Sequence, residues 1–342
     1  MATTVNGLGL NTTTAPDTLQ LEDFIEYRIS LKIHLYVLPI LVSIGIPGNI
    51  ISFVVLVFSS FRQRTSSIYL ATLAILDTVI LIISLLWFIS FYHPEEKIFR
   101  EGTCQFIHLV FYFAIHFDVL VMVAMTVERF IAVVFPLKAP NLISAKKAFI
   151  VIAGLGLFSF ALNLHHVFTK GMITTSSGYS SCWIVGDETT KYFVGKIYPW
   201  IDSVVYFLIP VTSLFVLNIA MIVKMRSRQS FTETGQRQMT VMLLLVTFAF
   251  LILTGPMGIV LMLGRYSWHP ETVEEKAVSK LIHSIVDNMM YANHAVNFVL
   301  YCMSGRRFRD EVKDMFCCRT CRGNDGTFKN STEIDMSVST AL

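Results

Sequence analysis

Charged residues are scarce in this chain. Only 15% of its 342 residues are Asp, Glu, Lys or Arg, whereas 54% are hydrophobic and the mean hydropathy is +0.61. A soluble globular domain carries roughly 25% charged residues. The shortage therefore indicates a protein whose solvent is lipid. The net charge of +3 is also small, and it predicts no nucleic acid or other polyanion as a partner.

Catalytic motifs are missing as well. The sequence shows no metal-ligand spacing, nucleophile elbow or phosphate-binding loop, so an enzyme is disfavoured. A transporter or channel would need inverted repeats, broken helices or rings of charge, and the sequence shows none of them. The first thirty residues lack a basic region followed by an apolar one, so we expect no cleavable signal peptide.

What the sequence does contain is a series of seven long apolar spans. They cover about residues 33–60, 68–92, 103–134, 147–168, 194–225, 238–264 and 278–303. Each reaches the roughly 20 residues that a helix needs to cross a bilayer core of about 30 Å. The sequence therefore predicts an all-α membrane protein, with a bundle of seven transmembrane helices over residues 33–304.

Lys and Arg are divided unequally between the two sides of this bundle. The N-terminal segment 1–32 and the loops after the second, fourth and sixth spans hold ten, and the other side holds seventeen. Because cytoplasmic loops are enriched in Lys and Arg, we expect the N-terminus to lie outside. The sequon at Asn11 would then be available for N-glycosylation.

An amphipathic segment follows the seventh span. Within residues 305–316, Phe308, Val312 and Met315 share one face and charged residues fill the others. This pattern predicts a short helix at the membrane interface. The cytoplasmic tail, residues 317–342, opens with three cysteines that are either palmitoylated or plain reduced thiols: Cys317, Cys318 and Cys321.

The third span has a notable residue at each end. Cys104 and Arg129 are 25 residues apart, which corresponds to about 37 Å of helix, slightly more than the bilayer core. They therefore lie at opposite rims. The outer side is oxidising, and Cys182 is the only other cysteine expected there. We predict a Cys104–Cys182 disulfide that fixes a loop over the mouth of the bundle.

Around Arg129 the sequence resembles the rhodopsin-like family of G-protein-coupled receptors. Alone, an arginine at a helix end is also explained by snorkelling to the interface. Here, however, Glu128-Arg129-Phe130 has the acid–arginine–aromatic order that ends the third helix in that family, and Pro136-Leu137 follows. The resemblance covers residues 33–316 and rests on further motifs: Gly48-Asn49, Leu73-Ala74-Ile75-Leu76-Asp77, Pro210, Phe250, Pro256 and Asn297-Phe298-Val299-Leu300-Tyr301.

The resemblance implies a plasma-membrane receptor that activates a heterotrimeric G protein. Its inner switch would comprise Glu128, Arg129, Phe130, Leu137, Asn218, Asn297 and Tyr301. Phosphorylation of the Ser and Thr residues in the tail would build an anionic segment, which in this family engages arrestin after a receptor kinase has acted. The terminal Thr340-Ala341-Leu342 is a short and weak match to a ligand of PDZ domains.

A cation site is a second implication. Asp77 lies near the middle of the second span, where a carboxylate is costly and by default functional. In the family the matching aspartate holds a sodium ion or a proton, and no other cofactor is expected. The partners here would be Asp118, Asn293 and Asn297, with His294 as a source of positive charge between two repelling carboxylates. The alternative is a structural cluster of hydrogen-bonded polar groups.

Some positions depart from the usual pattern of the family. Thr254 stands where a tryptophan usually precedes Pro256, and Phe298 stands where a proline is usual. In these departures the chain resembles the invertebrate FMRFamide-receptor-like neuropeptide receptors. They imply that activation does not use the tryptophan and passes through a different core: Val119, Pro210, Phe250, Thr254 and Pro256.

The predicted outer half of the bundle is aromatic and carries both signs of charge. Phe111 stands where amine receptors have an aspartate, and Tyr291 lies where an opsin needs a lysine, so both classes are disfavoured. Asp202 and Asp287 would receive a ligand cation, and Arg265 a carboxylate. The pocket candidates are Trp87, His108, Phe111, Tyr112, Trp183, Tyr198, Asp202, Tyr206, Arg265, His283, Asp287 and Tyr291.

The loop over residues 171–183 resembles the hairpin lid of peptide receptors. It is rich in Thr, Ser and Gly, and it would cover a pocket that is largely apolar with a few polar groups. We therefore predict a short neuropeptide as the ligand. A non-peptide small molecule is the alternative, and a transporter or channel is a more distant one.

Overall fold

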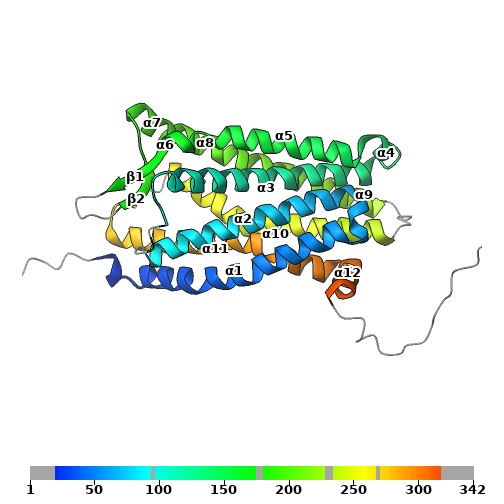
Figure 1. Cartoon of the computed structure of the whole chain (residues 1–342), viewed down its shortest axis with the longest axis horizontal. Helices are drawn as coiled ribbons and strands as arrows, with labels where there is room; N and C mark the ends of the chain where they lie inside the picture. Colours follow the sequence, from blue (N-terminus) through cyan, green and yellow to red (C-terminus); the bar gives the residue numbers. More distant parts are fainter. Residues whose placement is uncertain are drawn as a thin grey trace, which may run out of the picture.

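The computed structural model describes residues 20–93, 96, 98–174, 180–227, 234–266 and 270–316. Within these ranges, long helices lie side by side in a bundle (Figure 1). Several predicted features lie outside the described residues: the sequon at Asn11, the cysteines Cys317, Cys318 and Cys321, and the terminal residues 340–342.

The helices follow the predicted spans. The first four spans are α1 Ile25–Phe58, α2 Thr65–Tyr92, α3 Thr103–Val134 and α5 Ala145–Asn163. The fifth combines α7 Glu188–Tyr192, α8 Tyr198–Ser203 and α9 Ile209–Ser227, joined by π-helical turns at Phe193–Ile197 and Val204–Leu208. The last two are α10 Thr234–Tyr266 and α11 Val273–Ser304.

Short elements connect and extend these helices. They are the 3-10 turns Leu21–Asp23 and Ser60–Gln63, the helices α4 Ala139–Leu142, α6 His166–Thr169 and α12 Arg306–Phe316, and the strands β1 Lys170–Thr174 and β2 Ser180–Ile184. Among the described residues, six helical stretches are long and apolar enough to cross a membrane. The remaining long helix, α11, buries a row of polar side chains that includes Asn293 and Asn297.

Several predicted boundaries differ from the structure, among them the start of the fifth span, Glu188 rather than about 194, and of the seventh, Val273 rather than about 278. The first helix begins at Ile25 rather than near residue 33, so part of the segment predicted as 1–32 is helical. The fourth ends at Asn163, before the predicted residue 168. Hydropathy locates only the part of a helix that is apolar enough for hydrocarbon, whereas the helix itself continues through polar residues such as Glu26 and Arg28.

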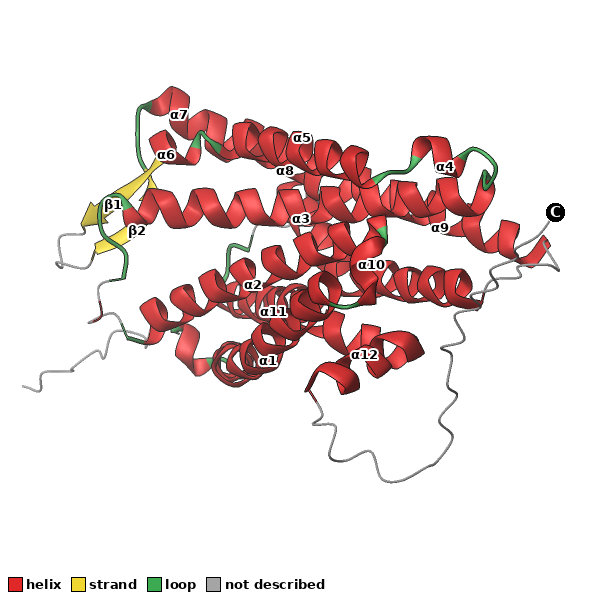
Figure 2. Cartoon of the chain, turned by 45° about the vertical axis from the view of Figure 1, so that its right-hand side comes forward, coloured by secondary structure: helices red, strands yellow, loops and turns green. Residues whose placement is uncertain are grey.

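A β-hairpin and a short helix mark the two ends of the bundle. Strands β1 and β2 pair antiparallel, with Met172 opposite Cys182, and they lie at the end opposite α12 (Figure 1). The other described elements are helical (Figure 2). The predicted hairpin loop is therefore present. We call the two ends the hairpin end and the α12 end.

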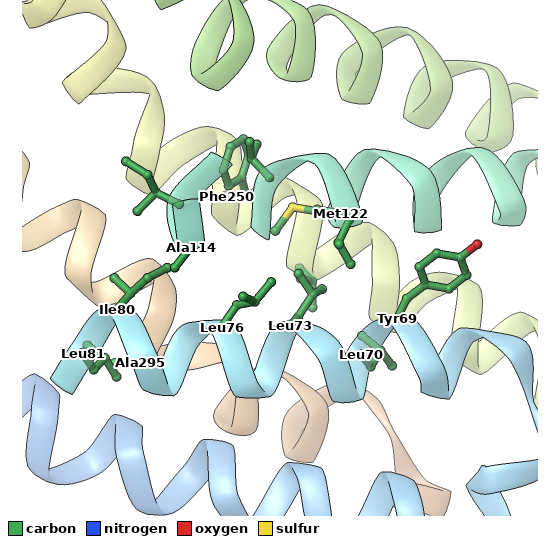
Figure 3. Packing of buried hydrophobic residues seen from close by; sticks show 14 of the residues in the cluster. Tyr69, Leu70, Leu73, Leu76, Ile80, Leu81, Ala114, Met122, Phe250 and Ala295 are labelled. Carbon is green, nitrogen blue, oxygen red and sulfur yellow. The ribbon is translucent and has the colours of Figure 1, made fainter. Parts of the chain in front are cut away.

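The core lies between α2, α3, α10 and α11. Leu73, Leu76 and Ile80 of α2 lie near Met122 of α3 and Phe250 of α10 in this packed cluster (Figure 3). Large apolar side chains also cover the outer surface of the helices, for example Ile44 on α1 and Phe158 on α5. A protein that is apolar both inside and outside needs lipid around it.

Small residues allow α1 to approach its neighbours closely. A Cβ added at Gly45 would lie 2.6 Å from a side-chain atom of Leu81 and 2.8 Å from the Cβ of Ala295. Helices in lipid gain little from burying apolar surface, and they associate through close van der Waals packing and hydrogen bonds. One such hydrogen bond runs from Asn49 Nδ2 to the carbonyl oxygen of His294, at 2.9 Å.

The predicted amphipathic helix is α12. Phe308 is its buried anchor, with its ring centroid 6.1 Å from Phe61 and 5.5 Å from Tyr301. Arg309 donates from Nη1 to the carbonyl oxygen of Cys302 at 2.6 Å, which satisfies one of the free carbonyls at the end of α11. The helix is therefore held against the bundle by its apolar face, as its sequence pattern predicts.

Candidate functional site

At the hairpin end, a disulfide joins Cys104 to Cys182, with their Cα atoms 5.7 Å apart. Cys104 lies in the first turn of α3, and Cys182 lies on β2. The predicted bond is therefore confirmed. It attaches the hairpin to the start of α3. The hairpin is therefore held in place above the aromatic side chains described next.

Replacing Cys182 with Ser is expected to destabilise this end of the molecule. The bond closes a stretch of 78 residues, and restricting a loop of that size in the unfolded chain is worth about 4 kcal/mol. We expect most of the variant to be lost from the cell surface, as measured by flow cytometry. Replacing the free cysteine Cys302 with Ser provides the control; equal losses in both variants would contradict a specific role for the disulfide.

Beneath the hairpin, several predicted pocket residues are in contact. The Trp87 ring centroid lies 4.4 Å from Phe111 and 5.7 Å from His108. Tyr112 stacks on His166 at 4.4 Å, and the Tyr198 hydroxyl donates to Asn163 Oδ1 at 2.6 Å. These rings come from α2, α3, α6 and α8, so the helices meet here around an aromatic cluster.

The remaining pocket candidates are more scattered. Trp183 on β2 is largely exposed, and Tyr206 is buried 6.2 Å from the ring of His116. His283, Asp287 and Tyr291 lie along α11. The side chain of Arg265 lies outside the described part of the structure.

The sequence predicted that Asp202 would receive a cation of the ligand. In the structure, its carboxylate faces a residue of the bundle instead. Its Oδ1 faces His116 Nε2 at 3.3 Å, although the two atoms are not aligned for a hydrogen bond. His116 Nδ1 lies 2.8 Å from the carbonyl oxygen of Tyr112 and 3.2 Å from Asn163 Nδ2. A buried carboxylate needs a partner of this kind. Asp202 therefore belongs first to a network between α3, α5 and α8.

In the middle of the bundle, Asp77 accepts two polar contacts from α11. Its Oδ1 lies 2.7 Å from His294 Nδ1, and its Oδ2 accepts a hydrogen bond from Asn297 Nδ2 at 2.7 Å. Asp118 Oδ2 lies 4.0 Å from the same His294 nitrogen. The structure thus brings Asp77, Asp118 and Asn297 together as predicted. The imidazole of His294, rather than the amide of Asn293, joins Asp77 from α11 in the described residues.

These residues do not fit the sodium ion that the resemblance implies. A hard cation takes several oxygen ligands, but each oxygen of Asp77 already faces a nitrogen. The ligand atoms of Asp77, Asp118 and His294 lie within 4.8 Å of one another, but one of the three is an imidazole nitrogen, and two carboxylates alone supply too few oxygens for sodium. The imidazole of His294 lies where a cation between the two carboxylates would be needed.

At the α12 end, Glu128 holds Arg129. Arg129 Nη2 donates to Glu128 Oε1 at 3.0 Å, and the hydroxyl of Thr65 on the first turn of α2 donates to the same oxygen at 2.5 Å. The side chains of Arg129 and Glu128 are only 15% and 8% exposed. A buried pair with an additional donor is stronger than a surface ion pair. Arg129 is therefore held inside the bundle rather than presented at its end.

The other residues of the predicted switch occupy two environments. Asn218 is buried and donates from Nδ2 to Thr247 Oγ1 at 2.7 Å, which links α9 to α10. Tyr301 is also buried. Leu137 is 93% exposed in the segment between α3 and α4, and Phe130 packs near Phe135, with ring centroids 6.0 Å apart.

The predicted activation core lies largely inside the bundle: Pro256 is half-buried and the other four residues are buried. Val119 and Phe250 belong to one packed cluster. Thr254, which stands where the family usually has tryptophan, is also buried, and its hydroxyl has no hydrogen-bond partner among the described residues. Pro256 lies within α10 and Pro210 within the first turn of α9, so each helix lacks a backbone donor near this core.

Comparison with known families decides the identity of this arrangement. The family model described as 7 transmembrane receptor (rhodopsin family) matches residues 48–301. The chain belongs to the rhodopsin family of seven-transmembrane receptors. It is therefore a receptor rather than an enzyme, and a multi-pass protein of the plasma membrane.

Individual relatives of this rhodopsin-family receptor are distant. The growth hormone secretagogue receptor type 1 of Oryctolagus cuniculus is 26% identical, over 79% of this chain and 76% of its own length. The galanin receptor type 1 of Rattus norvegicus is 22% identical, over 90% and 89%. A probable G-protein coupled receptor of Caenorhabditis elegans is 26% identical, over 83% and 69%. The narrower resemblance to FMRFamide-receptor-like receptors stays a prediction.

Sequence reasoning missed several polar residues of this rhodopsin-family receptor. His116, Asn163 and His166 are buried at the hairpin end, and Thr65 binds Glu128 at the α12 end. A signal for the first three was available, because polar side chains within apolar spans are costly and usually have a partner or a function. Thr65 carries no such signal, since it lies at a helix start where threonine is common.

Proposed function

We propose that this protein is a cell-surface receptor for a short extracellular peptide and that it signals through a heterotrimeric G protein. The observation that carries the proposal is the disulfide-tied hairpin above an aromatic cluster of Trp87, Phe111, Tyr112 and Tyr198. An apolar wall with a few polar groups suits a peptide. Two of the relatives, named as secretagogue and galanin receptors, support this ligand class.

In this proposal the hairpin end faces the outside of the cell. The disulfide supports this orientation because such bonds persist in oxidising compartments. The excess of Lys and Arg on the opposite side supports it as well. Asn11 would then be exposed to glycosylation, and the cysteines after α12 would lie beside the inner leaflet, where palmitoylation occurs.

The α12 end would bind the G protein. Release of Arg129 from Glu128, together with an outward movement of α10, would open a surface next to the exposed Leu137. A ligand and a G protein that both favour this open state raise each other's affinity. The phosphorylated tail would then recruit arrestin through its negative charge, and residues 340–342 would offer a weak contact for a PDZ domain.

A peptide-library screen tests the proposal. Cells expressing the full chain are exposed to pools of short synthetic peptides, and dissociation of G-protein subunits is recorded for several α classes. We expect at least one pool to activate the receptor, with no response in cells expressing an Arg129→Ala variant of equal surface level. Activation by non-peptide metabolites alone would favour the small-molecule alternative. Ion flux through the purified chain without a G protein would favour a channel.

A further inference from the structure

Four basic side chains gather beneath the hairpin, on the side of α6. His165 precedes α6, His166 begins it, and Lys170 follows it as the first residue of β1. His108 of α3 completes the group, with its ring centroid 6.4 Å from that of His166. Figure 1 shows α6 and β1 beside the start of α3. We call these four residues the basic cluster.

Two histidines of the basic cluster, His165 and His166, have ring nitrogens without partners among the described residues. His166 is 2% exposed, and neither Nδ1 nor Nε2 has a hydrogen-bond partner among the described residues. His165 Nε2 is also buried and unpartnered, whereas its Nδ1 faces Thr169 Oγ1 at 3.2 Å. A buried polar atom without a partner costs about 1–3 kcal/mol. A phenylalanine would fill the same space without this cost. The imidazole is therefore not explained by packing alone.

Among the described residues, no carboxylate acts electrostatically on His166. The ionisable groups that act on it electrostatically are all bases: His165, Lys170, His108 and His116. The nearby carboxylate, Asp202, faces His116 instead. Lys170 is partly buried and makes no ion pair within the described part of the chain, and burial lowers the pKa of its ammonium group. Within the described part of the protein, the cluster therefore has hydrogen-bond donors and the positive charge of Lys170 without an anion to receive them.

The walls of the cluster are aromatic and closely packed. Tyr112 stacks on His166 with an interplanar angle of 25°, and Tyr198 meets His165 edge-on at 4.1 Å. The hydroxyl of Tyr198 is already engaged by Asn163. His165 and Lys170 remain partly exposed, whereas His166 is buried. Low polarity around a charge strengthens its interaction with an opposite charge.

We infer that the basic cluster is the subsite for an anionic group of the ligand, with a carboxylate as the chemical class. A carboxylate offers two acceptor oxygens, which match an imidazole N–H of His166 and the ammonium of Lys170. Hydrogen bonds to charged groups are shorter and about twice as strong as neutral ones. The inference rests on the proposed peptide-receptor function. It specifies that a carboxylate of the peptide binds at the basic cluster.

The first experiment needs no agonist. The purified full chain in detergent is unfolded by heat in sodium chloride or in sodium acetate of equal ionic strength. We expect acetate to raise the melting temperature by about 2–4 °C if it reaches about ten times its dissociation constant. His166→Phe keeps the ring stack and removes both nitrogens, and Lys170→Gln removes the charge, so each should abolish at least half of the shift.

Lys196→Gln is the matched control, because it removes an exposed positive charge on the same side of the protein. It should keep the full acetate effect. Equal acetate shifts in the wild type, His166→Phe and Lys170→Gln would overturn the inference. If His166→Phe does not fold, the comparison of Lys170→Gln with Lys196→Gln decides the question by itself.

A second experiment separates this inference from the proposed function. For any peptide agonist with an acidic group, the analogue with an amide at that position is tested on the wild-type receptor and on His166→Phe. We expect at least a tenfold loss of potency on the wild type and less than a threefold difference on His166→Phe. A library without any active peptide would contradict the proposed function while the acetate result stands. An equal loss on both receptors would contradict the subsite.

Discussion

Replacing Glu128 with Gln is expected to raise signalling in the absence of any ligand. The carboxylate accepts hydrogen bonds from Arg129 at 3.0 Å and from Thr65 at 2.5 Å. The amide keeps the size of the side chain but loses its charge. A hydrogen bond to a charged group is worth about 1.5–3 kcal/mol, and about 1.4 kcal/mol corresponds to a tenfold change in an equilibrium. The ratio of open to closed receptors should rise roughly ten- to hundredfold.

Basal dissociation of G-protein subunits, measured at matched surface expression, checks this expectation. Thr65→Val is the graded control because it removes one of the two donors to the carboxylate and leaves the Glu128–Arg129 ion pair in place. Its basal signal should lie between those of the wild type and Glu128→Gln. A Glu128→Gln receptor with wild-type basal activity would show that this pair does not hold the closed state.

The sequence predicted the features of this receptor that depend on local chemistry. Long apolar stretches predict helices in lipid because the backbone has no other way to satisfy its hydrogen bonds there. The Cys104–Cys182 bond followed from topology, and α12 followed from the periodicity of Phe308 and Val312. Helix ends were less well predicted. The backbone of α1 continues to Ile25 through residues that hydropathy does not mark.

The side-chain partners within the bundle were harder to predict. Asn297 was expected beside Asp77 and lies there. Neighbouring residues on a helix point about 100° apart, so the choice between Asn293 and His294 depends on how α11 is rotated against α2. Hydropathy does not give this rotation. The pairing of His116 with Asp202 joins α3 to α8, and it likewise depends on how the two helices pack.

Replacing His294 with Phe is expected to be among the most destabilising single changes in the described core. The substitution removes the nitrogen 2.7 Å from Asp77 Oδ1 and also the base nearest to Asp118. Removing one partner of a buried hydrogen bond leaves the other group unsatisfied and costs about 1–3 kcal/mol, and more where the remaining group is charged. The melting temperature of the purified receptor should therefore fall by roughly 2–12 °C.

A second substitution distinguishes the loss of a partner from poor packing. Asp77→Asn removes the ionisable group that His294→Phe would leave without its partner, so the double variant should recover most of the lost stability. Losses that simply add would contradict the pairing, because independent sites are additive.

Sodium provides the final comparison. We expect no difference between sodium and choline chloride for the wild type, since the imidazole of His294 takes the cation's place. In His294→Phe that place holds an apolar ring, so the smaller variant His294→Ser should be the one that gains stability from sodium.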